Sequence, residues 1–286
     1  MADMSGKICV VTGATNGIGK VTALELAKMG ATVIVVGRSA ERTESVVKEI
    51  QQASGNNAVE ALLADLSVQA QVRELAAAIQ RKYEHLDVLV NNAGGMFLRR
   101  EETADGIEMT WALNHLNYFL LTNLLLDTLK RAPAARIVNV ASDAHEGGKI
   151  QFDDLAFKQR RYGWMVAYAQ SKLANIMFTY ELARRLNGTN VTANTLHPGF
   201  VNTNFGANNG TLARIAKVVM RPLALSPEQG ASTIIYLASS PEVEGTTGQY
   251  FVKCKPHRSS KASYDEAVQR RLWRVSEEMV GLPVTA

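Results

Sequence analysis

The hydrophobic and polar positions of this chain alternate between short apolar runs and longer segments with helical spacing. Seven runs rich in Val, Ile and Leu predict buried strands, and six segments with apolar residues three or four positions apart predict helices. This alternation is typical of an α/β fold with a doubly wound parallel sheet. The predicted strands cover residues 8–12, 32–36, 58–63, 87–90, 136–140, 191–196 and 249–252, and the predicted helices cover 18–29, 40–53, 68–83, 110–130, 165–186 and 227–238.

Length and composition favour one domain. A chain of 286 residues, 47% of them hydrophobic, suffices for one large α/β core, and no linker divides it. Cys9 and Cys254 are expected to be reduced thiols, because no secretory signal precedes them. No apolar run reaches the roughly 18 residues of a membrane span. We therefore expect a soluble, cytoplasmic protein.

The charge of the chain does not indicate a nucleic-acid partner. The net charge is +4, but Lys and Arg are spread over several helices, are balanced by acids and form no basic block. The five His and two Cys are scattered without ligand spacing, so we predict no metal site.

A glycine-rich segment joins the first predicted strand to the first predicted helix. Gly13, Gly17 and Gly19 lie in the sequence Thr-Gly-Ala-Thr-Asn-Gly-Ile-Gly at residues 12–19. Glycines let the backbone approach a pyrophosphate, and the amides of a helix N-terminus attract its charge. The spacing differs from the commoner Gly-x-Gly-x-x-Gly fingerprint. A phosphate-binding loop and a bare turn both fit the glycines taken alone.

Tyr168 and Lys172 lie four residues apart in a predicted helix, which places them on one face, one turn apart. A free tyrosine titrates near ~10. A cation one turn away favours the phenolate, so the pair indicates acid–base chemistry. Such pairs also occur by chance on solvated helices, and this one gains its weight from the glycine-rich segment upstream.

Together these motifs resemble the short-chain dehydrogenase/reductase family, and further residues agree in the family's order. Asn92, Ala93 and Gly94 follow one predicted strand, Ser142 follows another, and Asn114 lies in a long apolar helix. Residues 114–122, 171–175 and 271–276 look like the retinol dehydrogenase-like branch. The resemblance covers nearly the whole chain. It implies one Rossmann-type domain over residues 1–286 with about seven strands, a substrate lid at about 204–225 and a C-terminal extension at about 253–286.

The resemblance also implies a function. The chain would be an NADP(H)-dependent oxidoreductase that transfers a hydride between nicotinamide and a carbonyl or alcohol substrate, reducing a bulky apolar aldehyde or ketone such as retinal. Tyr168 would be the general acid, Lys172 would hold the nicotinamide ribose and lower the Tyr168 pKa, Ser142 would stabilise charge on the substrate oxygen, and Asn114 would anchor a relay water. The implied cofactor-binding residues are Gly13, Thr15, Asn16, Gly17, Ile18, Gly19, Arg38, Asp65, Leu66, Asn92, Ala93, Gly94, Tyr168, Lys172, Pro198, Gly199, Val201 and Thr203.

The end of the second predicted strand bears on the choice of cofactor. In NAD-using relatives an acidic residue there bonds the ribose hydroxyls. This chain has Gly37 instead, followed by Arg38 and Arg42. A guanidinium donates paired hydrogen bonds to phosphate oxygens, so the change favours the 2′-phosphate of NADP. The alternative is that both arginines are ordinary surface cations.

Two segments leave alternatives open. The interval from Ser142 to Tyr168 is longer than in many family members, and its aromatic residues would either line a substrate site or anchor the loop; we favour anchoring. Asp153 and Asp154 fit a solvated turn better than a pair of catalytic acids. Residues 211–221, which are apolar and basic, fall where the family places its lid, and a weak membrane-surface association is the rival interpretation.

The last two questions concern assembly and activity. After residues 249–252 the chain continues with Lys253 and Cys254, not with the acidic-glycine pair common in the family, so a homo-oligomer remains open. The alternative function is a non-enzymatic, NADP-binding regulator on the same fold. The complete set of Ser142, Tyr168 and Lys172 argues for the enzyme, because a binder needs no proton donor.

Overall fold

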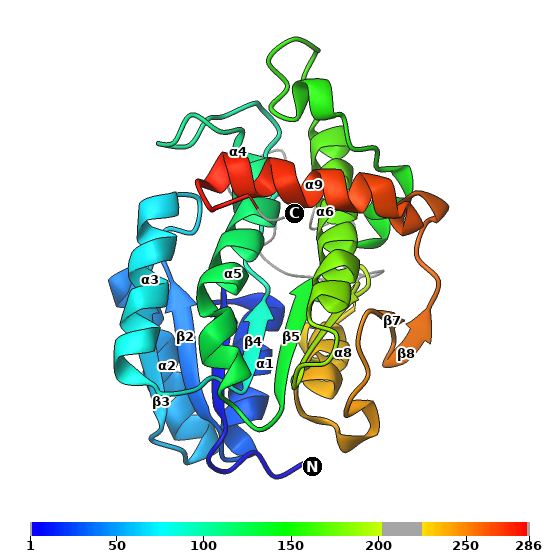
Figure 1. Cartoon of the computed structure of the whole chain (residues 1–286). Coiled ribbons are helices and arrows are strands. Elements are labelled where there is room, and N and C mark those ends of the chain that lie inside the picture. Colours follow the sequence, from blue (N-terminus) through cyan, green and yellow to red (C-terminus); the bar gives the residue numbers. More distant parts are fainter. Residues whose placement is uncertain (1, 202–224, 285–286) are drawn as a thin grey trace.

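A central sheet with helices on both faces organises the computed structural model, which describes residues 2–201 and 225–284 (Figure 1). Its eight strands lie in the order β3-β2-β1-β4-β5-β6-β7-β8, and the first seven are parallel. Their bounds are β1 Ile8–Thr12, β2 Thr32–Gly37, β3 Val59–Leu63, β4 Val88–Asn91, β5 Ala135–Val140, β6 Val191–Leu196, β7 Tyr250–Val252 and β8 Lys255–His257. The predicted α/β fold is confirmed.

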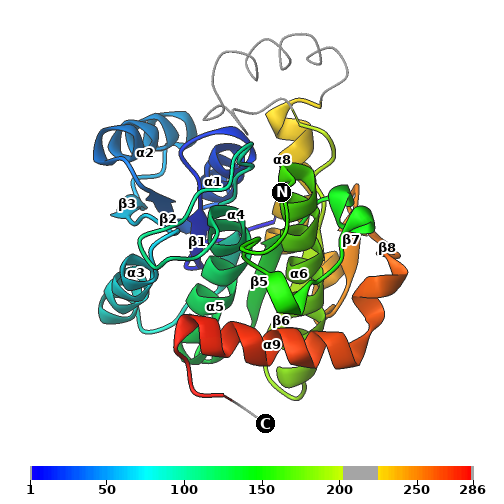
Figure 2. The ribbon, with the colours of Figure 1, turned by 90° about the horizontal axis from the view of Figure 1, so that it is seen from above.

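The helices form two layers, seen from above in Figure 2. One layer shares a core through Leu26, Ile50 and Ile234, and the other through Leu75, Leu120 and Phe178. The first layer contains α1 Gly17–Lys28, α2 Ala40–Ser54 and α8 Pro227–Ser239; the second contains α3 Gln69–Lys82, α5 Asn117–Lys130 and α6 Trp164–Arg185. The sheet is therefore doubly wound, as predicted.

The strand order reverses between β1 and β4. In open α/β sheets, ligands bind beyond the carboxyl ends of the strands at this switch point. The glycine-rich segment follows β1, Asn92 follows β4, and Ser142 follows β5 closely. The fold thus brings the predicted motifs to one edge of the sheet.

The prediction of about seven strands missed β8, which pairs antiparallel with β7 at the edge of the sheet. The two residues between these strands, Lys253 and Cys254, have φ values of 49° and 61°. Two positive φ values are typical of a type I′ hairpin turn, which normally carries Asn or Gly. Lys253 and Cys254 are not residues that favour this turn. Pro256 is also unfavourable for a strand, so the sequence does not indicate a strand at residues 255–257.

The predicted continuous helix over residues 110–130 is wrong in its first turns. A short helix α4, Met109–Trp111, is followed by a π-helical segment, Ala112–Leu116, before α5 begins. A π segment adds a residue to one turn of an otherwise α-helical stretch, and such insertions are frequent at functional sites. Asn114 lies inside it.

A C-terminal helix, α9 (Glu266–Val280), was not predicted and crosses α5 and α6 (Figure 1). Trp273, which is 4% exposed, packs its ring 4.9 Å from that of Phe119 and 5.8 Å from that of Phe178. Asp265 accepts a hydrogen bond from the Val268 amide at the N-cap, and Gly281 ends the helix. The sequence contains both capping residues. The helix was not predicted because most of its residues are polar and its apolar residues form only a narrow stripe.

The predicted lid over about 204–225 and the segment 211–221 lie outside the described residues, except for Leu225. Cys9 and Cys254 are free thiols, as expected. Among the described residues, no helix has the length and apolar content needed to cross a bilayer.

Candidate active site

The glycine-rich segment packs directly against the loop that follows β4. A Cβ atom on Gly13, whose φ is +64°, would lie 2.8 Å from the Ala93 Cα, and one on Gly19 would overlap the Asn92 side chain. The Asn92 Nδ2 donates to the Thr12 carbonyl at 2.8 Å. The backbones of the two loops therefore approach as closely as glycine permits.

Helix α1 begins inside this segment. Its first turn holds no acidic residue, and its N-cap, Asn16, makes no side-chain capping bond. The positive end of the helix is left for an anion, and Gly13 and Gly19 let the loop after β4 pack beside it. These residues fit the pyrophosphate of a dinucleotide.

The end of β2 cannot accommodate a side chain at Gly37. A Cβ there would overlap the Thr15 methyl group and the Thr43 hydroxyl. The neighbouring Arg38 is exposed, as is Arg42, whose amide donates to the Ser39 hydroxyl at 3.5 Å. The position that carries an acid in NAD-using relatives is therefore closed by packing, and the side chains beside it are cationic.

Two other predicted cofactor contacts are engaged within the protein. The Asp65 carboxylate accepts from the Ser67 amide at 3.0 Å and from its hydroxyl at 2.7 Å. Leu66 is 6% exposed and packs in the core. The Asp65 carboxylate shapes the turn after β3, and the contact of Asp65 and Leu66 with the cofactor stays a prediction.

Ser142, Tyr168 and Lys172 converge where β5 and α6 meet. The Ser142 hydroxyl hydrogen-bonds the Tyr168 phenol, and the Lys172 ammonium lies 5.6 Å from the centroid of the Tyr168 ring. Lys172 is 3% exposed, and its Nζ donates to the Val140 carbonyl at 3.0 Å. A Cβ on Gly94 would lie 3.6 Å from the same Nζ, so the loop after β4 also reaches the ammonium.

The electrostatics of this cluster differ from the expectation that Lys172 lowers the Tyr168 pKa. Burial raises the pKa of Tyr168 to about 12, with the Asp143 charge acting in the same direction and the Ser142 hydrogen bond opposing it. Burial lowers the pKa of Lys172 to about 7. Loss of hydration disfavours the charged form of both groups and outweighs their attraction. The isolated phenol is therefore protonated at neutral pH.

Asn114 is fully buried and hydrogen-bonded within the protein. Its Oδ1 accepts from the Gly95 amide at 2.8 Å, and its Nδ2 donates to the Gly95 carbonyl and the Ser171 hydroxyl, both at 3.0 Å. Its main-chain carbonyl accepts from Asn175 Nδ2 at 2.9 Å. The side chain ties the loop after β4 to α6, and the relay water predicted for Asn114 stays a prediction.

The loop after β6 closes the same edge. Gly199 has a φ of +82°, and its amide donates to His197 Nδ1 at 3.0 Å. A Cβ on Gly230 of α8 would meet side chains of both Val201 and Ile18. The glycine-rich segment and this loop therefore pack against one point on α8. Pro198 and Val201 are described, whereas Thr203 lies outside the described residues.

Phe157 and Tyr162 anchor the long interval before Tyr168, in line with the favoured alternative, whereas Trp164 is 37% exposed. Phe157 is 3% exposed and lies 5.3 Å from the Tyr162 ring. The Tyr162 hydroxyl donates to the Phe97 carbonyl at 2.9 Å. Asp154 accepts from three loop amides, including that of Lys158 at 2.6 Å, which confirms a turn at this position.

Sequence reasoning missed three residues around the cluster. Asp143 accepts from the Ser142 hydroxyl at 3.0 Å, Asn175 bonds the Asn114 carbonyl, and His145 bonds the Ser142 carbonyl at 2.7 Å. Asn175 follows Lys172 by three positions, so helical spacing would have placed it on the same face. The sequence carried no comparable signal for the contact of His145.

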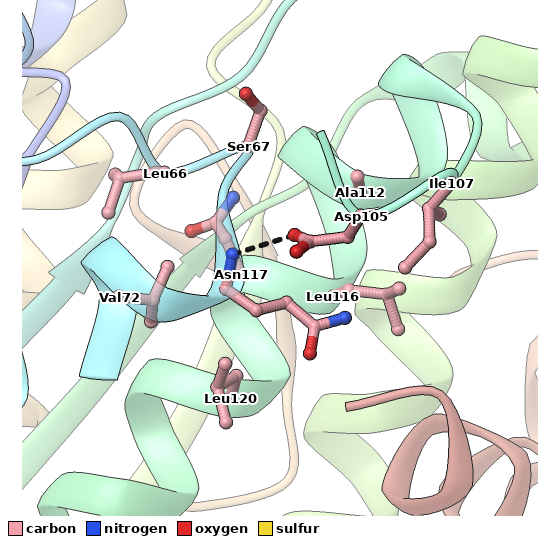
Figure 3. Close-up of a pocket in the computed structure, with 10 residues that line it drawn as sticks. Leu66, Ser67, Val72, Asp105, Ile107, Ala112, Leu116, Asn117 and Leu120 are labelled. Carbon is pink, nitrogen blue, oxygen red and sulfur yellow. Dashed lines mark hydrogen bonds between the residues drawn. The ribbon is translucent and has the colours of Figure 1, made fainter. Parts of the chain in front are cut away.

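Two cavities lie away from these residues. The smaller, of about 10 Å³, lies between α3 and the start of α5, and Figure 3 shows Asp105, Leu116 and Asn117 on its walls. It has room for about one water molecule. The larger, of about 430 Å³, lies between α6, α9 and the loop around Ile150. Ser142, Tyr168 and Lys172 line neither cavity.

Known proteins resemble this chain in sequence over most of its length. A family model described as short chain dehydrogenase matches residues 7–212. Human retinol dehydrogenase 13 is 44% identical over 286 residues, covering 98% of this chain and 86% of that protein. Human polyprenol dehydrogenase is 40% identical over 283 residues, covering 96% and 86%.

Two solved structures extend the likeness to the whole fold. A protein from Mycobacterium paratuberculosis has a TM-score of 0.82 at 32% identity, covering 100% of this chain and 97% of that one. The RhlG/NADP complex of Pseudomonas aeruginosa has a TM-score of 0.70 at 28% identity, covering 88% and 97%. From its sheet, the family model that it matches and its relatives, this chain belongs to the short-chain dehydrogenase/reductase family of nicotinamide-dependent oxidoreductases, in its retinol dehydrogenase-like branch.

Proposed function

We propose that the protein is an NADP(H)-dependent oxidoreductase that reduces a bulky, apolar aldehyde or ketone. The observation that carries the proposal is the convergence of Ser142, Tyr168 and Lys172 at the sheet edge that also holds the glycine-rich segment. A binding protein has no need of a proton donor held beside a second hydroxyl and a cation.

In this proposal the side chains have separate roles in the reaction. A bound reduced nicotinamide supplies the hydride. The hydroxyls of Ser142 and Tyr168 both hydrogen-bond the substrate oxygen, and Tyr168 then donates its proton to that oxygen. A pKa of about 12 keeps the phenol protonated beforehand. The Lys172 ammonium stabilises the phenolate that remains. Lys172 also holds the nicotinamide ribose, and Asn114 positions the loop after β4.

Packing at the end of β2 supports NADP over NAD. Gly37 has no room for the carboxylate that would bond the ribose hydroxyls. Arg38 is exposed beside it and available to a 2′-phosphate. The family assignment alone supports either dinucleotide, so this preference rests on two adjacent residues.

Exposed apolar side chains beyond β6 and at the start of α6 support an apolar substrate. Phe200 is 53% exposed in the loop after β6, and Trp164 and Met165 are 37% and 48% exposed in the first turn of α6, one turn before Tyr168. The names of two relatives, retinol dehydrogenase and polyprenol dehydrogenase, also refer to apolar alcohols. We infer that residues 1–286 act as one unit, with the lid at about 204–225 covering the substrate.

The test removes the phenolic oxygen of Tyr168. Tyr168→Phe should reduce kcat by roughly 10²–10⁴-fold, the usual contribution of a general acid, while the Kd for NADPH changes little. NADPH oxidation would be followed with retinal, aliphatic aldehydes, quinones and steroid ketones, and cofactor binding by NADPH fluorescence. Tyr236→Phe is the matched control, because that hydroxyl bonds Glu242, just beyond α8.

Two outcomes would contradict the proposal in different ways. Normal turnover by the Tyr168→Phe variant would refute the assignment of the general acid. A wild-type chain that bound NADPH but reduced none of these carbonyl compounds would favour a regulator.

A further inference from the structure

The C-terminal extension contacts a buried histidine, His145, close to Ser142 in the active site. His145 is 1% exposed and lies in a short 3₁₀ turn, Asp143–Gly147, directly after Ser142. Its Nδ1 lies 2.7 Å from the Ser142 carbonyl oxygen, and its Nε2 lies 3.0 Å from the main-chain nitrogen of Ser260. Ser260 belongs to the segment that runs from β8 to α9 (Figure 1, orange).

These two contacts fix the protonation of the ring. A backbone N–H can only donate, so Nε2 accepts from Ser260 and carries no proton. Nδ1 then carries the single proton of a neutral imidazole and donates it to the Ser142 carbonyl. The imidazole thus links the C-terminal extension to the main chain of Ser142 through two hydrogen bonds, one accepted from Ser260 and one donated to Ser142.

The ring is held on its remaining sides as well. It lies 5.2 Å from the Tyr250 ring of β7, and the His145 carbonyl accepts from the Gly148 amide at 2.9 Å. The His145 amide donates to the Ser142 carbonyl at 3.2 Å, so that oxygen receives two bonds from one residue. Ser142 is thereby held in an extended conformation, with φ −158° and ψ 155°.

We propose that His145 is a positioning residue, through which the Ser260 amide holds Ser142 in place beside Tyr168. The proposal rests on the proposed function, because Ser142 needs this precision only if it bonds a reacting oxygen. The C-terminal extension then contributes to catalysis indirectly, because Ser260 contacts His145 and His145 contacts Ser142. Detaching the extension from His145 would loosen Ser142 without altering the cofactor site.

Protonation of His145 opposes this arrangement. A proton on Nε2 would face the Ser260 N–H, and two donors cannot bond each other. Burial lowers the pKa of His145, while the Ser142 carbonyl and the carboxylates of Glu146 and Asp143 act in the opposite direction. The Tyr250 ring, on β7, lies against the imidazole, and His197, after β6, stacks on Tyr250 and is electrostatically coupled to His145.

Ser260 allows the contact to be broken from the side of the C-terminal extension. Its φ of −58° is close to the value that proline imposes. Within the described part of the chain its hydroxyl has no hydrogen-bond partner, and its carbonyl accepts from the Ser263 amide at 3.0 Å, which proline leaves intact. Ser260→Pro deletes the N–H donor, and because the proline Cδ takes the place of the hydrogen that points at Nε2, it also forces this segment away from His145. Ser260→Ala keeps the donor and serves as the matched control. His145→Phe keeps a ring against Tyr250 but removes both hydrogen bonds.

The expected result is a loss of kcat of roughly tenfold in S260P and H145F, with S260A within about twofold of wild type. A displacement well under 1 Å suffices for such a loss, since about 1 Å can cost about 10²-fold. The Kd for NADPH should not change in any variant. NMR titration of the histidine ring protons in the cofactor-free protein gives a second readout: S260P, but not S260A, should raise the pKa of His145, because Nε2 becomes free to accept a proton.

Two failures are distinguishable. If wild type is active and Tyr168→Phe is not, but S260P retains the wild-type kcat and the wild-type His145 titration, the positioning role of His145 is refuted alone. If wild type reduces no carbonyl compound, the proposed function fails, and a positioning role in catalysis fails with it. Circular dichroism of each variant excludes misfolding as the cause of a low kcat, and a misfolded S260P leaves H145F to decide.

Discussion

Replacing Arg38 by Leu tests the cofactor preference where it rests on a single side chain. Arg38 is exposed at the end of β2, and within residues 2–201 and 225–284 its guanidinium makes no hydrogen bond or ion pair. Removing the guanidinium therefore breaks no hydrogen bond or ion pair among these residues. The change in affinity then reports the contact with the 2′-phosphate rather than a change in folding.

The expected magnitude follows from the charge and exposure of the contact. A hydrogen bond to a charged group contributes about 1.5–3 kcal/mol, and about 1.4 kcal/mol corresponds to a tenfold change in Kd. The Kd for NADPH should rise by roughly 10–100-fold, and the Kd for NADH, which lacks the phosphate, by less than about twofold. Because the site is solvated, the effect on NADPH should shrink as salt is added.

The assay is fluorescence titration of NADPH and NADH at two ionic strengths. Lys48→Met is the control, because Lys48 is an exposed cation on the neighbouring helix, α2. Its removal alters the net charge equally but should weaken NADPH binding far less. Equal losses for NADPH and NADH in the Arg38 variant, or equal losses in both variants, would show that Arg38 does not bind the 2′-phosphate.

Two further predictions concern the C-terminal helix and the pH dependence. Trp273→Ala should lower the free energy of unfolding by about 3–5 kcal/mol, because it empties a buried aromatic site between α5 and α6; a loss below about 1 kcal/mol in urea denaturation would contradict this packing. Carbonyl reduction should slow as pH rises through about 7, because Lys172, whose pKa burial lowers to about 7, then loses the charge that stabilises the phenolate, while Tyr168, with a pKa of about 12, remains a donor. Steady-state reduction rates at saturating NADPH check this, and a rate that stays constant from pH 6 to 9 would contradict it.

The elements built on strong periodicity were predictable from the sequence. The strand at residues 8–12 was placed to the residue, and the helix carrying Tyr168 and Lys172 to within one residue at each end. In both cases a single local pattern decides the structure, because a parallel strand is buried on both faces and α6 is buried along most of its length. The order of the motifs then placed Ser142 and Asn92 at the correct edge.

The elements and contacts that the sequence did not predict depend on residues that are far apart in the chain. The hairpin at Lys253 and Cys254 adopts left-handed conformations without the residues that favour them, so the tertiary structure imposes the turn. Helix α9 is stabilised by a stripe that includes Trp273 and packs on residues far earlier in the chain, among them Phe119. The tie from Ser260 to His145 spans 115 positions, and no local pattern encodes such a contact.

The charge arrangement explains why a tyrosine and a lysine one turn apart do not by themselves make a base. Lowering the Tyr168 pKa from about 12 to about 7 would require roughly 7 kcal/mol, at about 1.36 kcal/mol per unit. Even at about 4 Å, a full positive charge supplies only about 4 kcal/mol at an effective dielectric constant of about 20. Lys172, with a pKa of about 7, carries only part of that charge at neutral pH. Burial therefore keeps the phenol as a proton donor, which is the form that carbonyl reduction consumes.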